Sequence, residues 1–521
     1  MNFKRAINFW DKLVMGIFLS ACASVTAASY EPSTTVPPKV EREFRGAWVA
    51  TVGNIDWPSR KTLTTAEQKA ELLAILDRAA QLKLNAIIFQ VRPACDAMYA
   101  SQIEPWSEYL TGAQGKAPLP AYDPLEFAVA EAQKRGLELH AWFNPYRSRH
   151  SNAKSPVAAN HVSKTKPNLV RKFGSYLWLD PGEREVQDYS LSVIMDVVKR
   201  YDIDGVQFDD YFYPYPSYGT RGPDGKYQDF PDDASWARYG ASGKLSRDDW
   251  RRENVNTFIR RVNESVHAAK PWVKFGVSPF GIWRPKNPPQ ISGYDAYAEL
   301  YADSRKWLIN GWVDYLSPQL YWAIDAKEQS FPVLLKWWDE QNPKNRHVWP
   351  GLDTTKVRDT TSDTTTIRRT SSERPGTQWR AAEIVSQIGL AAKQPVSSGH
   401  VHWNMKSLMR SSELQAALAR GEYAAPALVP AFKWLDSSAP AKPQFRAVAG
   451  AASVKLSWEI PATERISCWA LQFQRNGKWT TQILSGEKRS HILDGGLPET
   501  VAISAVDRTG NQSPPATLAR N

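Results

Sequence analysis

Two adjacent carboxylates, Asp209 and Asp210, stand where a short apolar strand pattern stops. The run Gly205 to Asp209 predicts a buried strand, and Pro214 keeps the aromatic segment that begins at Tyr211 from continuing it. Carboxylates are depleted in strands, but parallel barrel strands that end in acids place them on the face where active sites form. The pair therefore predicts proton-transfer chemistry, with capping of a following helix as the alternative.

The elements that position this pair repeat along the chain. From Glu43 to about Arg420, short β-type runs alternate with helical patterns such as Ala66 to Leu82. Eight strands are predicted: Gly46 to Val52, Ala86 to Val91, Glu138 to Phe143, Gly205 to Asp209, Lys274 to Ser278, Tyr315 to Tyr321, His347 to Gly351 and Gly399 to Asn404. Eight such units predict an α/β fold, a (β/α)8 TIM-type barrel. A doubly wound sheet is the alternative, although no Gly-x-Gly-x-x-Gly follows the first strand.

Long insertions follow the predicted strands 3, 4 and 7. They are Pro145 to Gly182, Tyr211 to Arg247 and Asp353 to Thr377, whereas the returns from helix to strand stay short. The βα loops of a barrel all lie on its catalytic face, so long loops there predict a groove.

Polar and aromatic side chains gather at the predicted strand ends. The expected substrate-binding residues there are Gln90, Arg92, Trp142, Asn144, Tyr146, Arg147, Tyr211, Gln319, Tyr321, Trp322 and Asn404. The loops add two acids, Asp56 and Asp180. Aromatic faces stack on sugar rings, amides and arginines bind hydroxyls, and carboxylates handle protons, so this mixture is typical of carbohydrate sites. One such residue alone would suit a core polar group, but the coincidence at five strands favours a site.

Glycosidic cleavage normally needs two carboxyl groups. The predicted fifth strand ends in Ser278-Pro279 and offers none, which leaves Asp209 and Asp210 as the expected catalytic pair. Adjacent strand residues point to opposite faces, so the two acids converge only if the strand ends between them. An adjacent pair suits substrate-assisted hydrolysis of N-acetylated sugars, in which one carboxyl protonates the leaving group and its neighbour orients the acetamide.

Seven motifs occur in order between residues 43 and 420. They are Arg45 to Thr51 with Asp56-Trp57-Pro58, Phe89 to Pro93, His140 to Arg147, Leu179 to Gly182, Asp204 to Tyr213, Gly276 to Gly281 and Ser317 to Trp322. Together they resemble glycosyl-hydrolase-like family 10 of bacterial envelope proteins, and Trp48 of the first motif joins the expected substrate-binding residues. The resemblance implies a barrel-type glycoside hydrolase. The family's divisome-localised glycosyl hydrolase acts on peptidoglycan glycan strands stripped of their stem peptides, which implies the same substrate here.

A non-catalytic glycan-binding envelope protein is the alternative function, because the predicted fifth strand supplies no carboxylate. We expect no cofactor and no metal. The chain has no Cys-x-x-Cys, and His400 and His402 on one predicted strand lack an obvious third ligand.

The N-terminus predicts export. Basic residues precede an apolar run from Leu13 to Leu19, which has the length of a signal-peptide core. The run ends in Leu19-Ser20-Ala21-Cys22, which resembles the lipobox of bacterial lipoproteins, where the cysteine is acylated. Ordinary cleavage after Ala27 is the alternative. We therefore expect a cell-envelope protein, facing the periplasm and held at the membrane by a lipid on Cys22.

The formal net charge of +11 suits an anionic polymer. Nucleic acid is not expected as a partner, because the chain is exported and has no Lys/Arg block. Scattered solubilising charge is the alternative explanation of the basic balance.

The predicted domains follow from these patterns. Residues 1–22 form the signal peptide with its lipobox, 23–42 a linker, 43–423 the barrel, 424–442 a second linker and 443–521 a small β-sandwich. In the last region, apolar residues alternate and Asn476-Gly477 predicts a hairpin turn. Its final strand, from Val501, resembles the end of a fibronectin type III module.

Overall fold

Short buried strands form one parallel sheet in the computed structural model, which describes residues 29–360 and 378–521. Their bounds are β2 (Phe44–Val49), β3 (Ala86–Arg92), β4 (Glu138–Phe143), β8 (Gly205–Phe208), β9 (Lys274–Val277), β10 (Tyr315–Leu316), β11 (His347–Val348), β12 (Gly351–Asp353) and β13 (Gly399–Trp403). Each strand except β12 begins within two residues of a predicted strand start, and β12 continues the seventh predicted strand. Nearly every residue in these strands is buried, as a barrel core requires.

The seventh barrel strand is split in two. Pro350 has no N–H to donate, and it separates β11, which pairs with β10, from β12, which pairs with β13. A bridge between Gly351 and Gln319 continues the ladder across the split, and β13 pairs with β2. The sheet therefore closes on itself, and the prediction of a (β/α)8 TIM-type barrel is confirmed.

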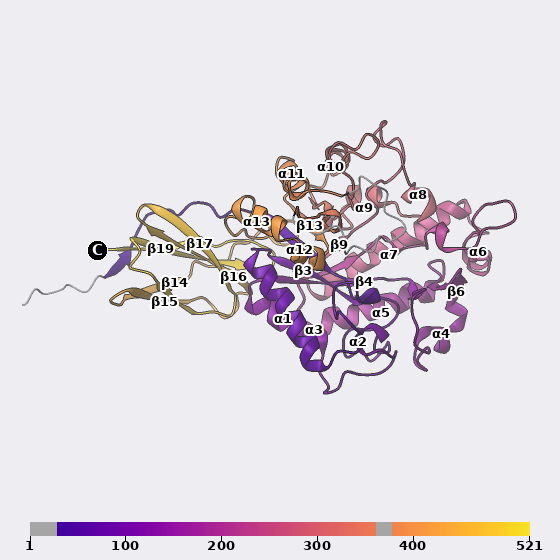
Figure 1. Cartoon of the computed structure of the whole chain (residues 1–521), viewed down its shortest axis with the longest axis horizontal. Helices are drawn as coiled ribbons and strands as arrows, with labels where there is room; N and C mark the ends of the chain where they lie inside the picture. Colours follow the sequence, from indigo (N-terminus) through magenta and orange to yellow (C-terminus); the bar gives the residue numbers. More distant parts are fainter. Residues whose placement is uncertain (1–28, 361–377) are drawn as a thin grey trace, which may run out of the picture.

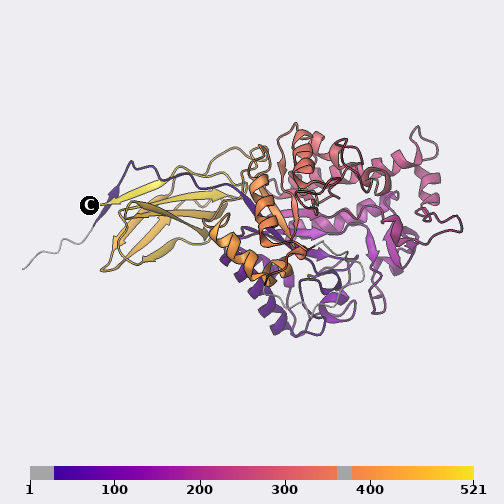
Figure 2. The same ribbon diagram turned by 45° about the horizontal axis from the view of Figure 1, so that its top comes forward.

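Helices surround the parallel strands (Figures 1 and 2). In the first of them, Thr64 caps the N-terminus with Glu67 in a reciprocal capping box, and Leu72, Leu76 and Ala79 are buried against the sheet. The helices that follow the barrel strands are α1 (Thr65–Gln81), α3 (Pro124–Lys134), α5 (Arg184–Arg200), α7 (Arg247–Ala269), α9 (Ser304–Asn310), α10 (Phe331–Glu340), α11 (Ala381–Ala391) and α13 (Ser412–Arg420). Within the described residues, no helix is both long and apolar enough to cross a bilayer.

The insertions carry structure of their own. After β4, three short antiparallel strands pair in the order β5-β7-β6. They are β5 (Arg147–Arg149), β6 (Val170–Phe173) and β7 (Tyr176–Leu179). The short helices are α2 (Glu108–Thr111), α4 (Val162–Thr165), α6 (Asp233–Tyr239), α8 (Ala296–Glu299) and α12 (Met405–Arg410), with 3-10 turns η1 (Val52–Asn54), η2 (Pro167–Leu169), η3 (Pro216–Tyr218) and η4 (Thr354–Lys356).

A β-sandwich lies beside the barrel along the long axis of the molecule (Figure 1). One sheet has the order β1-β20-β19-β16-β17 and the other β14-β15-β18. The strands are β1 (Tyr30–Pro32), β14 (Gln444–Ala449), β15 (Ser453–Glu459), β16 (Ile466–Arg475), β17 (Lys478–Ser485), β18 (Ser490–Asp494), β19 (Thr500–Asp507) and β20 (Ala516–Arg520). Asn476 and Gly477 both have positive φ and join β16 to β17, as an Asn-Gly hairpin turn requires.

The described part of the first expected linker, residues 29–42, and the second expected linker, residues 424–442, are ordered parts of the structure. In the first, β1 pairs with β20 and so completes a sheet of the sandwich. In the second, Phe432 is fully buried against His347 and Trp349 of the barrel, and Trp434 donates to Asp314 at 2.7 Å. Phe432 and Trp434 therefore anchor the second segment, although its Ala and Pro content is typical of a linker.

Arg508 of the sandwich fastens it to the barrel end that lies opposite the βα loops. Its guanidinium donates to Asp202 at 2.8 Å and pairs with Asp204 at 3.0 Å, just before β8 begins. Arg42 spans the same junction through hydrogen bonds to the carbonyls of Val429 and Gly510. The sandwich is therefore docked against the end of the barrel that lies opposite the candidate catalytic face.

Cys22 and the rest of the predicted signal peptide lie outside the described residues. Most of the third predicted insertion, Asp353 to Thr377, does so as well.

Phe432→Ala is expected to lower the free energy of unfolding by about 3–5 kcal/mol, because it leaves a cavity between barrel and sandwich. The neighbouring Lys433 is exposed, so Lys433→Ala should change it by less than about 0.5 kcal/mol. Urea unfolding of both variants measures the difference. Equal stability of the two would show that this segment does not stabilise the junction.

Candidate active site

The candidate active site lies where β8 ends. The strand stops at Phe208, one residue before its predicted end, so Asp209 and Asp210 both belong to the loop that follows. Each is only 5% exposed, so burial raises the pKa of both, and the charge of Arg147 opposes this rise. Because the strand geometry ends before them, the two adjacent side chains reach the same buried region.

Asp209 is held by N–H donors from the third strand of the barrel and its loop. The indole nitrogen of Trp142 donates to Oδ2 at 3.1 Å, and the amide nitrogen of Asn144 lies 3.3 Å from each carboxyl oxygen. Neither nitrogen can accept a hydrogen bond. These contacts favour the ionised form of Asp209.

Asp210 has partners of a different kind. The hydroxyl of Tyr215 donates to its Oδ2, and the side chain of Gln319 forms a second hydrogen bond with the same carboxyl. The Gln319 amide also donates to the carbonyl of Ser278 at 3.1 Å, which fixes it between the ends of β9 and β10.

Arg147 is itself immobilised. Its side chain donates twice to the carbonyl of Pro93, at 3.1 and 3.0 Å, and its backbone N–H donates to the side-chain oxygen of Asn144 at 2.9 Å. Its guanidinium carbon lies 4.8 Å from the ring centroid of Tyr211. The positive charge beside the acid pair is therefore part of the fixed framework.

Burial dominates the electrostatics of the pair. It raises the pKa of Asp209 to about 7, an effect that Arg147 opposes and the charge of Asp210 reinforces. Burial also raises the pKa of Asp210, against its hydrogen bonds to Tyr215 and Gln319. Both carboxyls have a raised pKa, and the negative charge of each disfavours ionisation of the other, so the pair is suited to hold one proton and to offer an acid and a base together.

Trp142, which donates to Asp209, belongs to a group of three tryptophans in contact. The ring of Trp403, at the end of β13, contacts Trp142 at 6.1 Å and Trp48 at 6.0 Å between centroids. Trp48 and Trp142 are buried, whereas Trp403 is partly exposed. An exposed aromatic edge next to a buried acid is suited to contact a sugar ring.

The end of β10 supplies two more of the expected residues. Tyr321 is partly buried, and burial together with the charges of Asp353 and Asp210 raises its pKa far above the ordinary value. Its hydroxyl therefore stays protonated and can donate. Trp322 is partly exposed and contacts Phe280 at 5.7 Å between ring centroids.

Three of the expected substrate-binding residues hold loops instead. Arg92 is fully buried and makes a bidentate ion pair with Glu104, at 2.6 Å for the shortest contact. The Gln90 side chain accepts from the backbone of the loop after β2, at 2.8 and 2.9 Å. Asp56 accepts from the backbone N–H groups of Ala50 and Lys406, both at 2.8 Å. Paired charges and backbone caps of this kind satisfy buried loop ends.

Two further expectations are corrected in the same way. Tyr146 is fully buried and its ring packs on Phe258 of α7, so it belongs to the core outside the barrel strands. Asn404 caps α12 by accepting from the backbone N–H of Ser407 at 3.1 Å.

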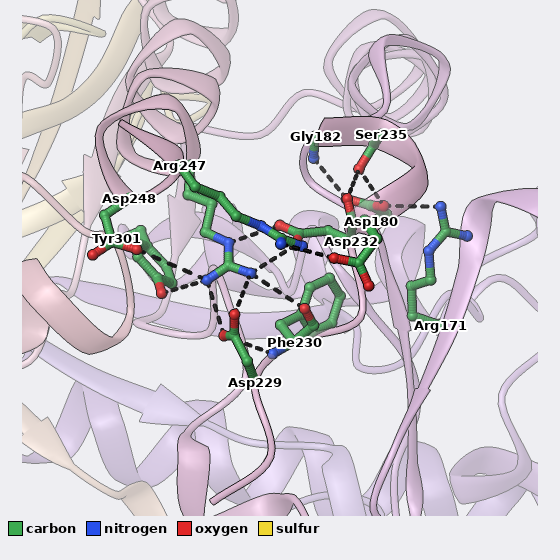
Figure 3. Close-up of polar contacts among 12 residues, drawn as sticks. Arg171, Asp180, Gly182, Asp229, Phe230, Asp232, Ser235, Arg247, Asp248 and Tyr301 are labelled. Atoms are coloured by element: carbon green, nitrogen blue, oxygen red, sulfur yellow. Dashed lines mark hydrogen bonds and ion pairs between the residues drawn. The ribbon is translucent and has the colours of Figure 1, made fainter. Parts of the chain in front are cut away.

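Asp180 belongs to a separate charged cluster (Figure 3). It pairs with Arg171 at 2.9 Å and accepts from Ser235 at 2.8 Å and from the backbone of Gly182 at 2.9 Å. Burial raises its pKa to about 6. In the same region, Arg251 holds Asp232 at 2.6 Å, which fastens the insertion after β8 to α7.

Two residues at the acid pair were not among the expected site residues. Tyr215 donates to Asp210, and Trp403 lies against Trp142. The sequence carried a signal for each: Tyr215 stands between Pro214 and Pro216, which fix its backbone, and Trp403 directly precedes a predicted strand end.

The two histidines of β13 face a tyrosine. His400 and His402 both hydrogen-bond to the hydroxyl of Tyr423, at 2.5 and 2.8 Å. Among the residues that the structure describes, no group of three or more His, Cys, Asp or Glu side chains is placed to hold a metal ion.

The barrel and its acid pair define a glycoside hydrolase-like protein. The chain belongs to the family described as Glycosyl hydrolase-like 10, which matches residues 43–366. The expectation of this family from the seven motifs is confirmed.

Several known proteins are similar to this chain. Glycosyl hydrolase YngK of Bacillus subtilis (strain 168) is 35% identical over 533 aligned residues, which cover 98% of each protein. Glycosyl hydrolase DigH of Escherichia coli (strain K12) is 36% identical over 372 residues, 66% of this chain and 82% of DigH. The solved glycoside hydrolase domain of PgaB (BpsB) from Bordetella bronchiseptica aligns with a TM-score of 0.46 at 13% identity, covering 73% of this chain and 98% of that domain.

Asp209→Asn is expected to change how stability depends on pH. The Asp209 carboxyl has a pKa of about 7 in the folded protein. In the unfolded chain its pKa is about 3.9, so it favours folding while protonated, and this contribution is lost as pH rises towards 7. Asparagine does not titrate, so the variant's free energy of unfolding should exceed that of the wild type by about 1–2 kcal/mol at pH 8 and by less at pH 5.

Urea unfolding at the two pH values measures this difference. The exposed Asp224 serves as the control, because Asp224→Asn should leave the pH dependence unchanged. Parallel curves for wild type and Asp209→Asn would contradict a raised pKa at Asp209.

Proposed function

We propose that this protein hydrolyses glycosidic bonds in peptidoglycan glycan strands that lack stem peptides. The observation that carries the proposal is the buried pair Asp209 and Asp210, whose pKa values are both raised by burial. Family membership and the likeness to a protein named as a glycosyl hydrolase support hydrolysis. The aromatic and amide groups around the pair support a sugar substrate.

The arrangement suits a substrate-assisted reaction on an N-acetylated sugar. The acetamide oxygen forms a bond to the anomeric carbon while the bond from that carbon to the leaving oxygen breaks. The acid of the pair gives its proton to the leaving oxygen, and the other carboxylate orients the acetamide and stabilises its developing positive charge. Water then adds to the anomeric carbon and gives its proton to the carboxylate that acted as the acid, and the acetamide is released.

The hydrogen-bond partners support one division of the two roles. Asp209 accepts only from N–H groups, which satisfy a negative charge, so it is the carboxylate that orients the acetamide. The hydroxyl of Tyr215 can turn to accept, so the shared proton is accommodated on Asp210, which acts as the acid. Arg147 opposes the effect of burial on both carboxyls, which supports an ionised partner for the acid.

A non-catalytic glycan-binding function is the second candidate. It is favoured by the end of the fifth barrel strand, where β9 leads into Ser278 and supplies no carboxylate. Both functions need the aromatic groups around the acid pair, but only hydrolysis needs the acids themselves.

Asp209→Asn and Asp210→Asn are each expected to reduce turnover about 10²-fold or more, the range for losing a general acid or base. New reducing ends released from denuded glycan strands measure the turnover. Both variants should fold, because asparagine keeps the size of the side chain. Asp224→Asn, on the exposed part of the same insertion, should retain wild-type turnover.

Two folded acid-pair variants with wild-type turnover would contradict the catalytic assignment. Wild-type protein that binds denuded strands but releases no reducing ends would favour the binding function.

We also propose a cell-envelope location with a lipid on Cys22, supported by the lipobox-like Leu19-Ser20-Ala21-Cys22. Mass spectrometry of protein made in a bacterium should show a mature chain that begins at Cys22 and carries acyl groups. Cys22→Ala should release the protein from the membrane fraction. A mature chain that begins at Ala28 without acyl groups would contradict the anchor.

A further inference from the structure

Six ring side chains form a connected group across the loops above the barrel, here termed the aromatic row: Tyr176, Tyr218, Tyr211, Tyr215, Tyr294 and Phe280. Successive ring centroids are 4.5, 6.5, 5.8, 5.2 and 5.4 Å apart. These separations are those of rings in contact, so the row is one connected surface.

The row is assembled from three different insertions. Tyr176 begins β7, three of the tyrosines lie between β8 and α6, and Phe280 and Tyr294 follow β9. All six are partly exposed, whereas Phe212 and Tyr213 of the same insertion are at most 1% exposed. Core packing explains the second set. It does not explain why three separate loops bring partly exposed rings together.

Two glycines permit this convergence. Gly174 has a φ of +55°, and a Cβ there would collide with the carbonyl oxygen of Tyr218. A Cβ on Gly219 would lie 2.7 Å from the ring of Phe173. The β6–β7 turn therefore approaches the Tyr218 loop more closely than any other residue type allows, and this places Tyr176 on Tyr218.

The row is continuous with the acid pair. Tyr215, near its middle, donates to Asp210. Tyr211 lies over Arg147, whose charge acts on both carboxyls. A molecule that contacts the row therefore also reaches the acids.

We propose that the aromatic row binds a linear chain of N-acetylated hexosamines over several sugar units, so that the acid pair meets bonds inside a chain. Aromatic rings contact the apolar faces of sugars, and tyrosine hydroxyls add hydrogen bonds. Tyr176 is joined to Phe280 through four ring contacts, by way of Tyr218, Tyr215 and Tyr294, so the row offers ring faces to more than one sugar. This inference rests on the proposed function and adds to it the length of substrate that is bound.

Binding to chitohexaose and chitobiose tests the inference with the full-length protein carrying Asp210→Asn, so that no hydrolysis interferes. We expect chitohexaose to bind more tightly than chitobiose. In this background, Tyr176→Ala with Tyr218→Ala should raise the Kd for chitohexaose about 10-fold or more, the range for losing two ring contacts. The Kd for chitobiose, which is held next to the acids, should change less than about twofold.

Three controls keep the test specific. Tyr176→Phe with Tyr218→Phe keeps both rings and should retain most of the affinity. Tyr227 lies in the same insertion but outside the row and is 37% exposed, so Tyr227→Ala should bind as the parent does. Thermal melts confirm that each variant is folded.

Unchanged affinity of the double alanine variant for chitohexaose would overturn the inference, as would equal losses for both oligosaccharides. The proposed function fails separately, through unchanged turnover of Asp209→Asn and Asp210→Asn. Chain-length-dependent binding without hydrolysis would support the row and overturn only the catalytic assignment.

Discussion

The buried guanidinium of Arg147 is the interaction on which the candidate site depends. Burial favours the uncharged form of two adjacent carboxyls that are each 5% exposed. Arg147 opposes burial most at Asp209 and adds a smaller effect at Asp210, and it is held by the carbonyl of Pro93 and the ring of Tyr211. Through these contacts, the positive charge of Arg147 is held where the loops after β3, β4 and β8 meet.

The barrel could be predicted from the sequence because short apolar runs typical of buried strands alternate with segments whose apolar residues have helical spacing. Each of the eight predicted strands has a counterpart, and even the split of the seventh follows from Pro350. The position of the acid pair could also be predicted, because carboxylates are depleted in strands and two of them directly after an apolar run therefore stand out. A family resemblance over seven motifs then narrowed the class of protein.

The roles of single polar residues could not be predicted as well. Arg92 stands at a strand end and Asp180 in a loop on the catalytic face. Each nevertheless binds a residue outside its own motif: Arg92 pairs with Glu104, and Asp180 accepts a hydrogen bond from Ser235. A sequence position shows which face a residue reaches but not which partner it finds there. Tyr215 was not predicted as a site residue, because it lies in a loop whose sequence has no hydrophobic periodicity that would place its side chain. The docking of the second expected linker could not be predicted, because a single buried ring such as Phe432 does not alter a composition rich in Ala and Pro.

The pairing of β1 with β20 has a mechanical consequence. Residue 29 lies beside the C-terminus, where the backbone N–H of Asn521 donates to the carbonyl of Ser29 at 3.0 Å, at the end of the sandwich remote from the barrel (Figure 1). A tension applied to the chain ahead of β1 would first load the ladder between β1 and β20 in shear. The sandwich would carry that force, and the barrel with its acid pair would be shielded from it.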